Sequence, residues 1–233
     1  MRSSESFFFK CSAIWFLLLV FWGFAPSFYL ADYFDPDYHL PQHLVLHGVV
    51  FSLWVLLYAI QVFLVGYKKY ATHRFLGGIG LVIMILMVPT GIFPSIYKVY
   101  EGTMTIDGAG HNVFRLFSGY GLFTLAFVFR SKGFLHKRFM LGCMVMLTSA
   151  AIFRISFDVN MQDNQLFNKG FQILPALLLF LLDWANRKKV VLIDLISPVL
   201  VLGIFFLADY FWLSSVGELA MDLLISIFVK TIV

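Results

Sequence analysis

Long apolar stretches separated by short polar segments form the main pattern of this chain. The clearest stretches are Cys11–Ala31 and Phe75–Tyr97, neither of which contains a charged residue. At 1.5 Å per residue, runs of this length cross a hydrocarbon layer about 30 Å thick. Because lipid offers no hydrogen-bond partners, the backbone of such a run must be helical. The pattern therefore predicts an all-α, polytopic membrane helix bundle.

Seven stretches are predicted to span the membrane, and an eighth is left open. The last segment, 216–233, carries Glu218 and Asp222 among apolar residues. It could lie along the interface as an amphipathic helix or insert as a short eighth span. The whole chain, 1–233, is interpreted as a single integral membrane domain. The seven expected helices cover residues 10–31, 43–66, 74–97, 112–130, 138–157, 167–186 and 189–212.

Charge alternates from one connection to the next. Lys and Arg gather at 67–74, 130–138 and 187–189, whereas the connections between them carry the acidic groups of Asp32–Asp37 and Glu101–Asp107. Lys and Arg are concentrated on the cytoplasmic side of membrane proteins. The alternation therefore predicts a multi-pass protein of a bacterial inner membrane, with the N-terminus and the three basic segments in the cytoplasm.

Composition supports a lipid environment. Of the 233 residues, 61% are hydrophobic, against about 45–50% apolar residues in soluble domains. The net charge of +4 is what basic cytoplasmic connections produce, so the bilayer is the expected partner and nucleic-acid binding is not expected. Two cysteines are too few for a disulfide or cysteine–zinc framework. The oligomeric state is left open.

Four of the six histidines recur in a repeating layout. His47 and His111 begin apolar runs on the predicted outer side, and His73 and His136 begin the following runs on the inner side. Residues 43–157 are therefore interpreted as two copies of one hairpin, which together form a four-helix core. If the copies pack together, His47 meets His111 near the outer end and His73 meets His136 near the inner end. Helical bundles build cofactor sites from such inward-facing side chains.

The first functional hypothesis is b-type haem binding with electron transfer across the membrane, which implies a redox partner. Each histidine pair would ligate one haem iron from opposite sides. The layout is similar to that of two-haem b-type transmembrane cytochromes. Arg115 lies one turn after His111 and could pair with a haem propionate, with the outer headgroups or with a nearby aspartate. Histidines beside basic residues are also typical of interfacial anchors, so binding of no cofactor is the alternative.

The second hypothesis is a metal-dependent membrane hydrolase with its site on the outer face. His43 and His47 lie four residues apart on one helix face, and His111 and Asp158 are expected at the same depth. Three imidazoles and a carboxylate suit zinc, which activates a bound water for hydrolysis. The set is similar to that of membrane hydrolases of the alkaline ceramidase and adiponectin receptor type, although there the H-x-x-x-H element lies in the last helix.

The third hypothesis is a transporter or structural membrane subunit without a cofactor. Pro89 and Pro94 fall within one predicted helix, where proline removes a backbone hydrogen bond and introduces a kink. Arg154 and Asp158 form an i,i+4 pair within another predicted span, which suits a salt bridge inside a bundle.

Two short segments carry a family resemblance. They are His-Arg-x-x-Gly at His73–Gly77 and His-Lys-Arg-x-Met at His136–Met140. With the surrounding stretches His47–Gly80 and Leu135–Arg154, they resemble an uncharacterised group of bacterial multi-pass membrane proteins. The resemblance implies a membrane-embedded helical fold and no particular activity.

Overall fold

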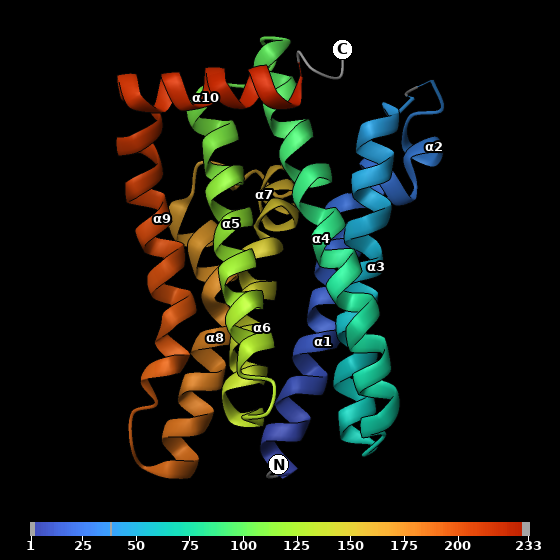
Figure 1. Cartoon of the computed structure of the whole chain (residues 1–233), viewed down its shortest axis with the longest axis vertical. Helices are drawn as coiled ribbons and strands as arrows, with labels where there is room; N and C mark the ends of the chain where they lie inside the picture. The colour runs from blue at the N-terminus through green and yellow to red at the C-terminus, as the bar shows by residue number, and fades with distance from the viewer. Residues whose placement is uncertain (1–2, 38, 230–233) are drawn as a thin grey trace.

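The computed structural model describes residues 3–37 and 39–229, and the regular structure in these ranges is helical throughout. Figure 1 shows the long helices side by side along one axis. The predicted all-α bundle is therefore confirmed. The elements are α1 (Ser3–Phe24), a π-helix (Ala25–Tyr29), α2 (Ala31–Phe34), α3 (Gln42–Gly66), α4 (Tyr70–Tyr100), α5 (Ile106–Val128), α6 (Gly133–Leu147), α7 (Ser149–Asp158), α8 (Gln165–Arg187), a 3-10 helix (Leu192–Leu195), α9 (Ile196–Trp212) and α10 (Ser215–Phe228).

Five helical segments of the described chain are long and apolar enough to cross a membrane. A sixth is obtained if α6 and α7, which meet at an angle of 43°, form one bent span. Helix α5 runs parallel to them (Figure 1) but does not meet this criterion, because glycines and polar residues such as His111 and Arg115 dilute its apolar character. The described chain thus has five to six candidate spans, and the predicted count of seven or eight is not confirmed. The five segments are Ser3–Tyr29, Gln42–Gly66, Tyr70–Tyr100, Gln165–Arg187 and Leu192–Trp212.

Helix α10 lies across the end of the bundle. Figure 1 shows it perpendicular to the long helices, over the ends of α9, α5 and α4. The Ser214 side chain caps its N-terminus by accepting a hydrogen bond from the backbone N–H of Gly217. A Cβ at Gly217 would lie 2.2 Å from the carbonyl oxygen of Phe211, so the tight turn out of α9 requires glycine there. Of the two arrangements left open for this segment, the structure has the helix along the end of the bundle.

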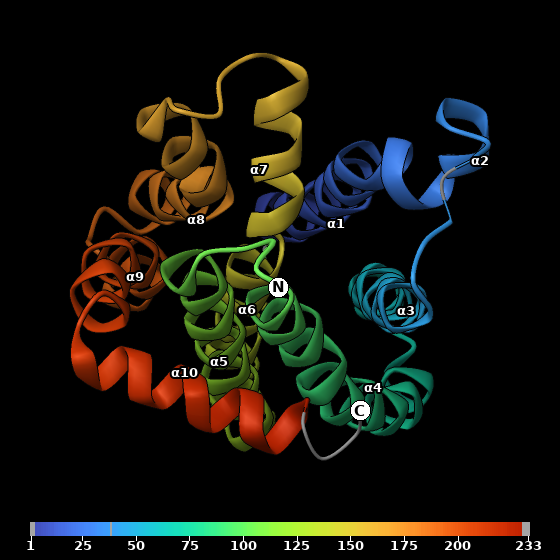
Figure 2. The ribbon, with the colours of Figure 1, turned by 90° about the horizontal axis from the view of Figure 1, so that it is seen from above.

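Within 43–157, α3–α4 and α5–α6 form two antiparallel hairpins, which meet where α4 packs on α5, and α7 follows α6 after the bend. Figure 2 shows α1 between α3 and α7, and it packs against both of these helices. Glycine allows this contact, because a Cβ at Gly23 of α1 would lie 2.5 Å from the carbonyl oxygen of Ala151 in α7. Helix α1 therefore belongs to the core alongside the two hairpins.

The outward surface of the bundle is apolar. Large hydrophobic side chains on different helices point away from the core, including Leu18 (62% exposed), Phe75 (72%) and Phe206 (70%). An exposed apolar surface spread over several helices is typical of a protein surrounded by lipid. The expected bilayer environment is consistent with this surface.

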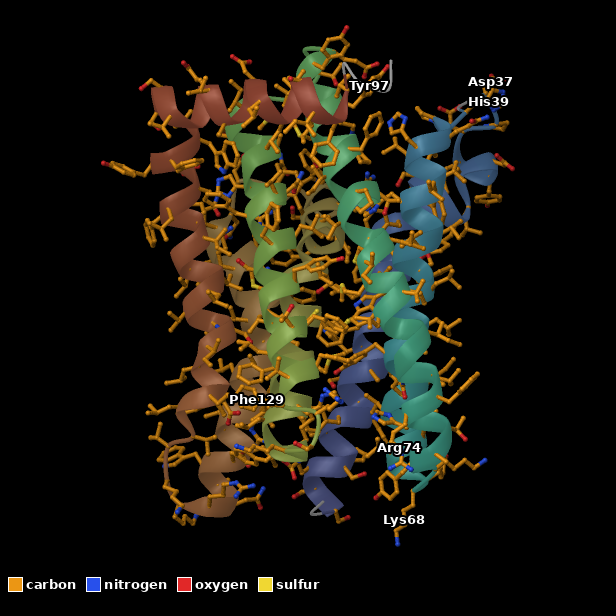
Figure 3. The ribbon with its side chains drawn as sticks, viewed as in Figure 1. Asp37, His39, Lys68, Arg74, Tyr97 and Phe129 are labelled. Carbon is orange, nitrogen blue, oxygen red and sulfur yellow. The ribbon has the colours of Figure 1, made fainter. Side chains whose placement is uncertain are left out.

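The two ends of the bundle differ in charge. Lys68 and Arg74 lie at one end, whereas Asp37 and His39 lie at the other (Figure 3). The N-terminus and the α3–α4, α5–α6 and α8–α9 connections share the first end, which we call the basic end (Figure 1). The opposite end, which we call the acidic end, carries the α4–α5 and α7–α8 connections and α10. The alternation of charge along the sequence is thus a segregation of charge in space.

Candidate functional site

His73 and His136 lie side by side at the basic end. They occupy the first turns of α4 and α6, and their ring centroids are 6.2 Å apart with the ring planes at 88°. The Nδ1 atom of His136 lies 2.8 Å from the carbonyl oxygen of Ala126 in α5. Because a carbonyl only accepts, Nδ1 carries the hydrogen, and Nε2 is the nitrogen left for a ligand. The predicted inner histidine pair is therefore brought together by the fold.

Neighbouring helices hold the His73 side of this pair. The side-chain amide of Gln61 in α3 donates to the backbone carbonyl of His73 at 3.1 Å, which ties the first turn of α4 to α3. The Nδ1 atom of His73 is buried and has no hydrogen-bond partner among the described residues. A buried polar atom without a partner costs free energy. A ligand bound to this nitrogen would remove that cost.

The predicted outer pair of His47 and His111 is not assembled. Nε2 of His111 lies 2.7 Å from Oδ1 of Asp209, so this ring is turned toward α9. The ring of His47 stacks on Phe51, and its Cε1 atom lies 3.3 Å from the position of a Cβ at Gly91 of α4. Helix α5 thus presents His111 to α9 and away from the α3–α4 hairpin. The structure therefore does not bring His47 and His111 together, and a second haem between them stays a prediction.

Arg115 follows His111 into the contact between α5, α8 and α9. It lies within electrostatic range of Lys169, whose Nζ is 4.5 Å from the centre of the Phe205 ring. The same group includes Asp209, the hydrogen-bond partner of His111. Because this cluster lies one to three turns inside the acidic end, Arg115 is not placed to serve the histidine pair at the basic end.

The predicted zinc set is not assembled either. His43 packs edge-on against Tyr97 of α4, with ring centroids 5.1 Å apart, while His111 is bound to α9 and Asp158 ends α7. Within residues 3–37 and 39–229, no group of three or more His, Cys, Asp or Glu side chains could hold a metal ion. His43, His47, His111 and Asp158 therefore do not form the expected metal site, because they face different neighbours.

Arg138, two residues after His136, is the centre of a buried ionic cluster. Its side chain is only 1% exposed. Nε donates to Asp194 at 2.8 Å, Nη1 donates to Glu5 at 3.2 Å, and Nη2 donates to Asp183. The guanidinium also lies 3.7 Å from the ring centre of Phe134. One arginine thus joins α1, α6, α8 and the 3-10 helix at the basic end.

Two further cations complete the cluster. Lys137 binds Glu5 at 2.6 Å, and Arg187 binds Asp183 at 2.9 Å. Asp194 follows the basic residues at 187–189 closely in the sequence, but the structure pairs it with Arg138. The sequence does hold a signal for this cluster, since Glu5, Asp183 and Asp194 are acidic residues in segments of the basic end.

The structure therefore retains one predicted constellation, His73 with His136, and adds the ionic cluster around Arg138. Both lie in or beside the first turn of α6. Both are features of this chain's own structure. Comparison of this chain with protein-family models, with curated proteins and with solved structures finds no match.

Proposed function

We propose that this chain is an integral protein of a bacterial inner membrane and holds one b-type haem between His73 and His136. The observation that carries the proposal is the 6.2 Å separation of the two ring centroids. Two metal–nitrogen bonds of about 2 Å, with about 1 Å from each nitrogen to its ring centre, place imidazoles that share one iron about 6 Å apart. The observed spacing matches this requirement.

The surroundings of the pair also suit haem ligation. Histidine ligands commonly donate their second nitrogen to a carbonyl, which fixes the ring orientation, and His136 does so toward Ala126. The buried Nδ1 of His73 lacks a partner in the described chain. Arg74, exposed beside His73, offers a guanidinium to a propionate. Haem would supply one-electron chemistry, while these residues would hold and orient it.

We propose further that seven segments cross the membrane, namely the five apolar segments, α5 and the bent α6–α7 pair. The basic end then faces the cytoplasm, because Lys and Arg favour that side. The haem would lie near the cytoplasmic surface, within reach of a soluble redox partner. Since His47 and His111 are not paired, electron exchange at this face is a better fit than transfer through two haems across the membrane.

An absorption spectrum of the detergent-solubilised protein, expressed with a haem precursor, tests the proposal. One haem per chain and a reduced-state α-band are expected. His73→Ala and His136→Ala should each lose the haem, whereas the matched variants His43→Ala and His111→Ala should keep it. Size-exclusion profiles show whether each variant is folded. A folded wild-type protein that takes up no haem would refute the proposal.

A further inference from the structure

Four charged or polar side chains meet where α5, α8 and α9 come together near the acidic end. Nε2 of His111 lies 2.7 Å from Oδ1 of Asp209, and the His111 ring centre is 6.2 Å from that of Phe205 in α9. Nζ of Lys169 in α8 lies 4.5 Å from the centre of the same phenylalanine ring. Arg115 lies one turn after His111 on the same face of α5, and within electrostatic range of Lys169. We call His111, Arg115, Lys169 and Asp209 the Arg115 group.

The Arg115 group holds one more positive than negative charge. Arg115 and Lys169 are cations and Asp209 is a carboxylate, with His111 counted as neutral. Among the described residues, neither Arg115 nor Lys169 forms a salt bridge or a side-chain hydrogen bond. Both side chains are half-buried, and a cation withdrawn from water is costly unless it is paired. A ligand with a single negative charge would remove this cost.

The directions of α5 and α8 aim both cations toward the acidic end. Both helices begin at that end (Figure 1), at Ile106 and Gln165. Lys169 lies about one turn, and Arg115 about two and a half turns, from these starts. Because Cα–Cβ bonds tilt toward the N-terminus of a helix, both side chains extend back toward the acidic end. The positive ends of the two helix dipoles lie there as well, which favours an anion.

Exposed apolar side chains flank the Arg115 group. Tyr210, next to Asp209 in α9, is 84% exposed, and aromatic residues of this kind gather where acyl chains meet headgroups. Phe206 of α9 is also exposed, as is Leu166, one turn before Lys169 in α8. The headgroup layer on each side of a bilayer is about 5–7 Å thick. Lys169 and Asp209, each about 5–6 Å from a helix end, lie within this layer if the helices span the bilayer.

We propose that Arg115 and Lys169 bind the phosphate of an anionic phospholipid such as phosphatidylglycerol, in the leaflet at the acidic end. A phosphodiester carries one negative charge, which matches the surplus of the Arg115 group. Arginine holds phosphate oxygens with paired N–H donors, and lysine adds a point charge. A zwitterionic lipid brings its own cation and leaves the surplus in place. The proposal requires the membrane insertion proposed above but not the haem at the basic end, so a haem spectrum does not decide it.

Thermal unfolding of the full-length protein in detergent, followed by tryptophan fluorescence, tests this inference. Phosphatidylglycerol added to the micelles should raise the midpoint temperature in a saturable manner, because a ligand that binds only the folded state stabilises it. Phosphatidylcholine at the same mole fraction should not. Arg115→Gln and Lys169→Gln should each weaken the apparent affinity at least about fivefold. The matched control is Lys132→Gln, which should leave the affinity unchanged, because Lys132 also lies near a phenylalanine ring, at 5.6 Å, but is exposed at the basic end.

Asp209→Asn tests the charge balance in the opposite direction. The asparagine oxygen can still accept a hydrogen bond from His111, while the surplus rises to two positive charges, so the affinity for phosphatidylglycerol should increase. An unchanged or weaker affinity would overturn the inference, and this variant decides the question if the arginine and lysine variants do not fold. Equal shifts with phosphatidylcholine, or full affinity in both Arg115→Gln and Lys169→Gln, would also overturn it. Saturable binding of inorganic phosphate in place of the lipid, at an ionic strength matched with chloride, would assign the site to a free anion and reject the lipid.

Discussion

Replacing Arg138 should destabilise the bundle more than replacing any exposed arginine. Leucine at this position keeps an apolar side chain but removes all three carboxylate contacts of the guanidinium. The three carboxylates differ in the cation that each keeps when the guanidinium of Arg138 is removed. Glu5 keeps Lys137 at 2.6 Å, and Asp183 keeps Arg187 at 2.9 Å. Arg138 is the only cation among the described residues that is hydrogen-bonded to the Asp194 side chain, which is 0% exposed.

The expected cost of Arg138→Leu is therefore that of one buried carboxylate left without a partner. Breaking a buried ion pair in this way costs about 3–5 kcal/mol, whereas replacing both partners by apolar residues is often close to neutral. Arg138→Leu combined with Asp194→Leu should accordingly recover most of the lost stability. The control is Arg187→Leu, because the Arg187 side chain is 28% exposed and Asp183 retains Arg138. Loss of a partly exposed pair of this kind costs about 1 kcal/mol or less.

Unfolding titrations with sodium dodecyl sulfate in mixed micelles would measure these free energies. The four proteins of the cycle give a coupling energy between Arg138 and Asp194, which should be at least about 2 kcal/mol for contacting groups in one buried network. A double variant as unstable as Arg138→Leu alone would refute the reasoning. That result would mean that the arginine acts through packing on Phe134 or through Glu5 and Asp183, and not through the isolated carboxylate.

Two further predictions concern topology and packing. Single cysteines are placed at Lys68 and at Glu101 in a background without the native cysteines. In intact cells an impermeant maleimide should label the cysteine at 101 and not the one at 68. Labelling at 68 in place of 101 would show that the orientation is opposite to the proposed one. Gly23→Leu should destabilise the protein by about 1–3 kcal/mol through overpacking, because a Cβ at Gly23 would lie 2.5 Å from Ala151. The control is Gly121→Leu, which should leave the stability unchanged because no atom lies within 4 Å of a Cβ at Gly121. Equal unfolding midpoints for the two variants would contradict the close α1–α7 contact.

The helical segments could be predicted because lipid forces apolar runs to satisfy their own backbone. Residues 43–66 were expected as a helix, and α3 covers Gln42–Gly66. The bend between α6 and α7 has no comparable signal, and 138–157 was expected as one helix. At the bend, Thr148 donates to the carbonyl of Met144 at 2.7 Å, a side-chain bond that bends helices but occurs at many straight positions too.

The candidate site was predictable to the extent that it depends on helix ends. His73 and His136 each begin a helix after a short connection at the same end, so the hairpin repeat was sufficient to bring them together. His47 and His111 required a particular rotation of α5 about its axis. In the structure α5 packs against α4, α6 and α9, and Asp209 of α9 binds His111. An apolar sequence that packs on several sides gives little indication of it.

The position of Arg138 links the two features of the basic end. His136 and Arg138 lie two residues apart in the first two turns of α6. The ring of His136 is tied to α5, and the guanidinium of Arg138 is tied to α1, α8 and the 3-10 helix. A pair of haem ligands must be held rigidly at one spacing, because a small displacement of either ring breaks the shared coordination. The ionic cluster supplies that rigidity to α6, as the bond from Gln61 to His73 does to α4. Besides supporting the proposed orientation of the chain, the charged residues at this end therefore fix the start of α6, from which the proposed ligand projects.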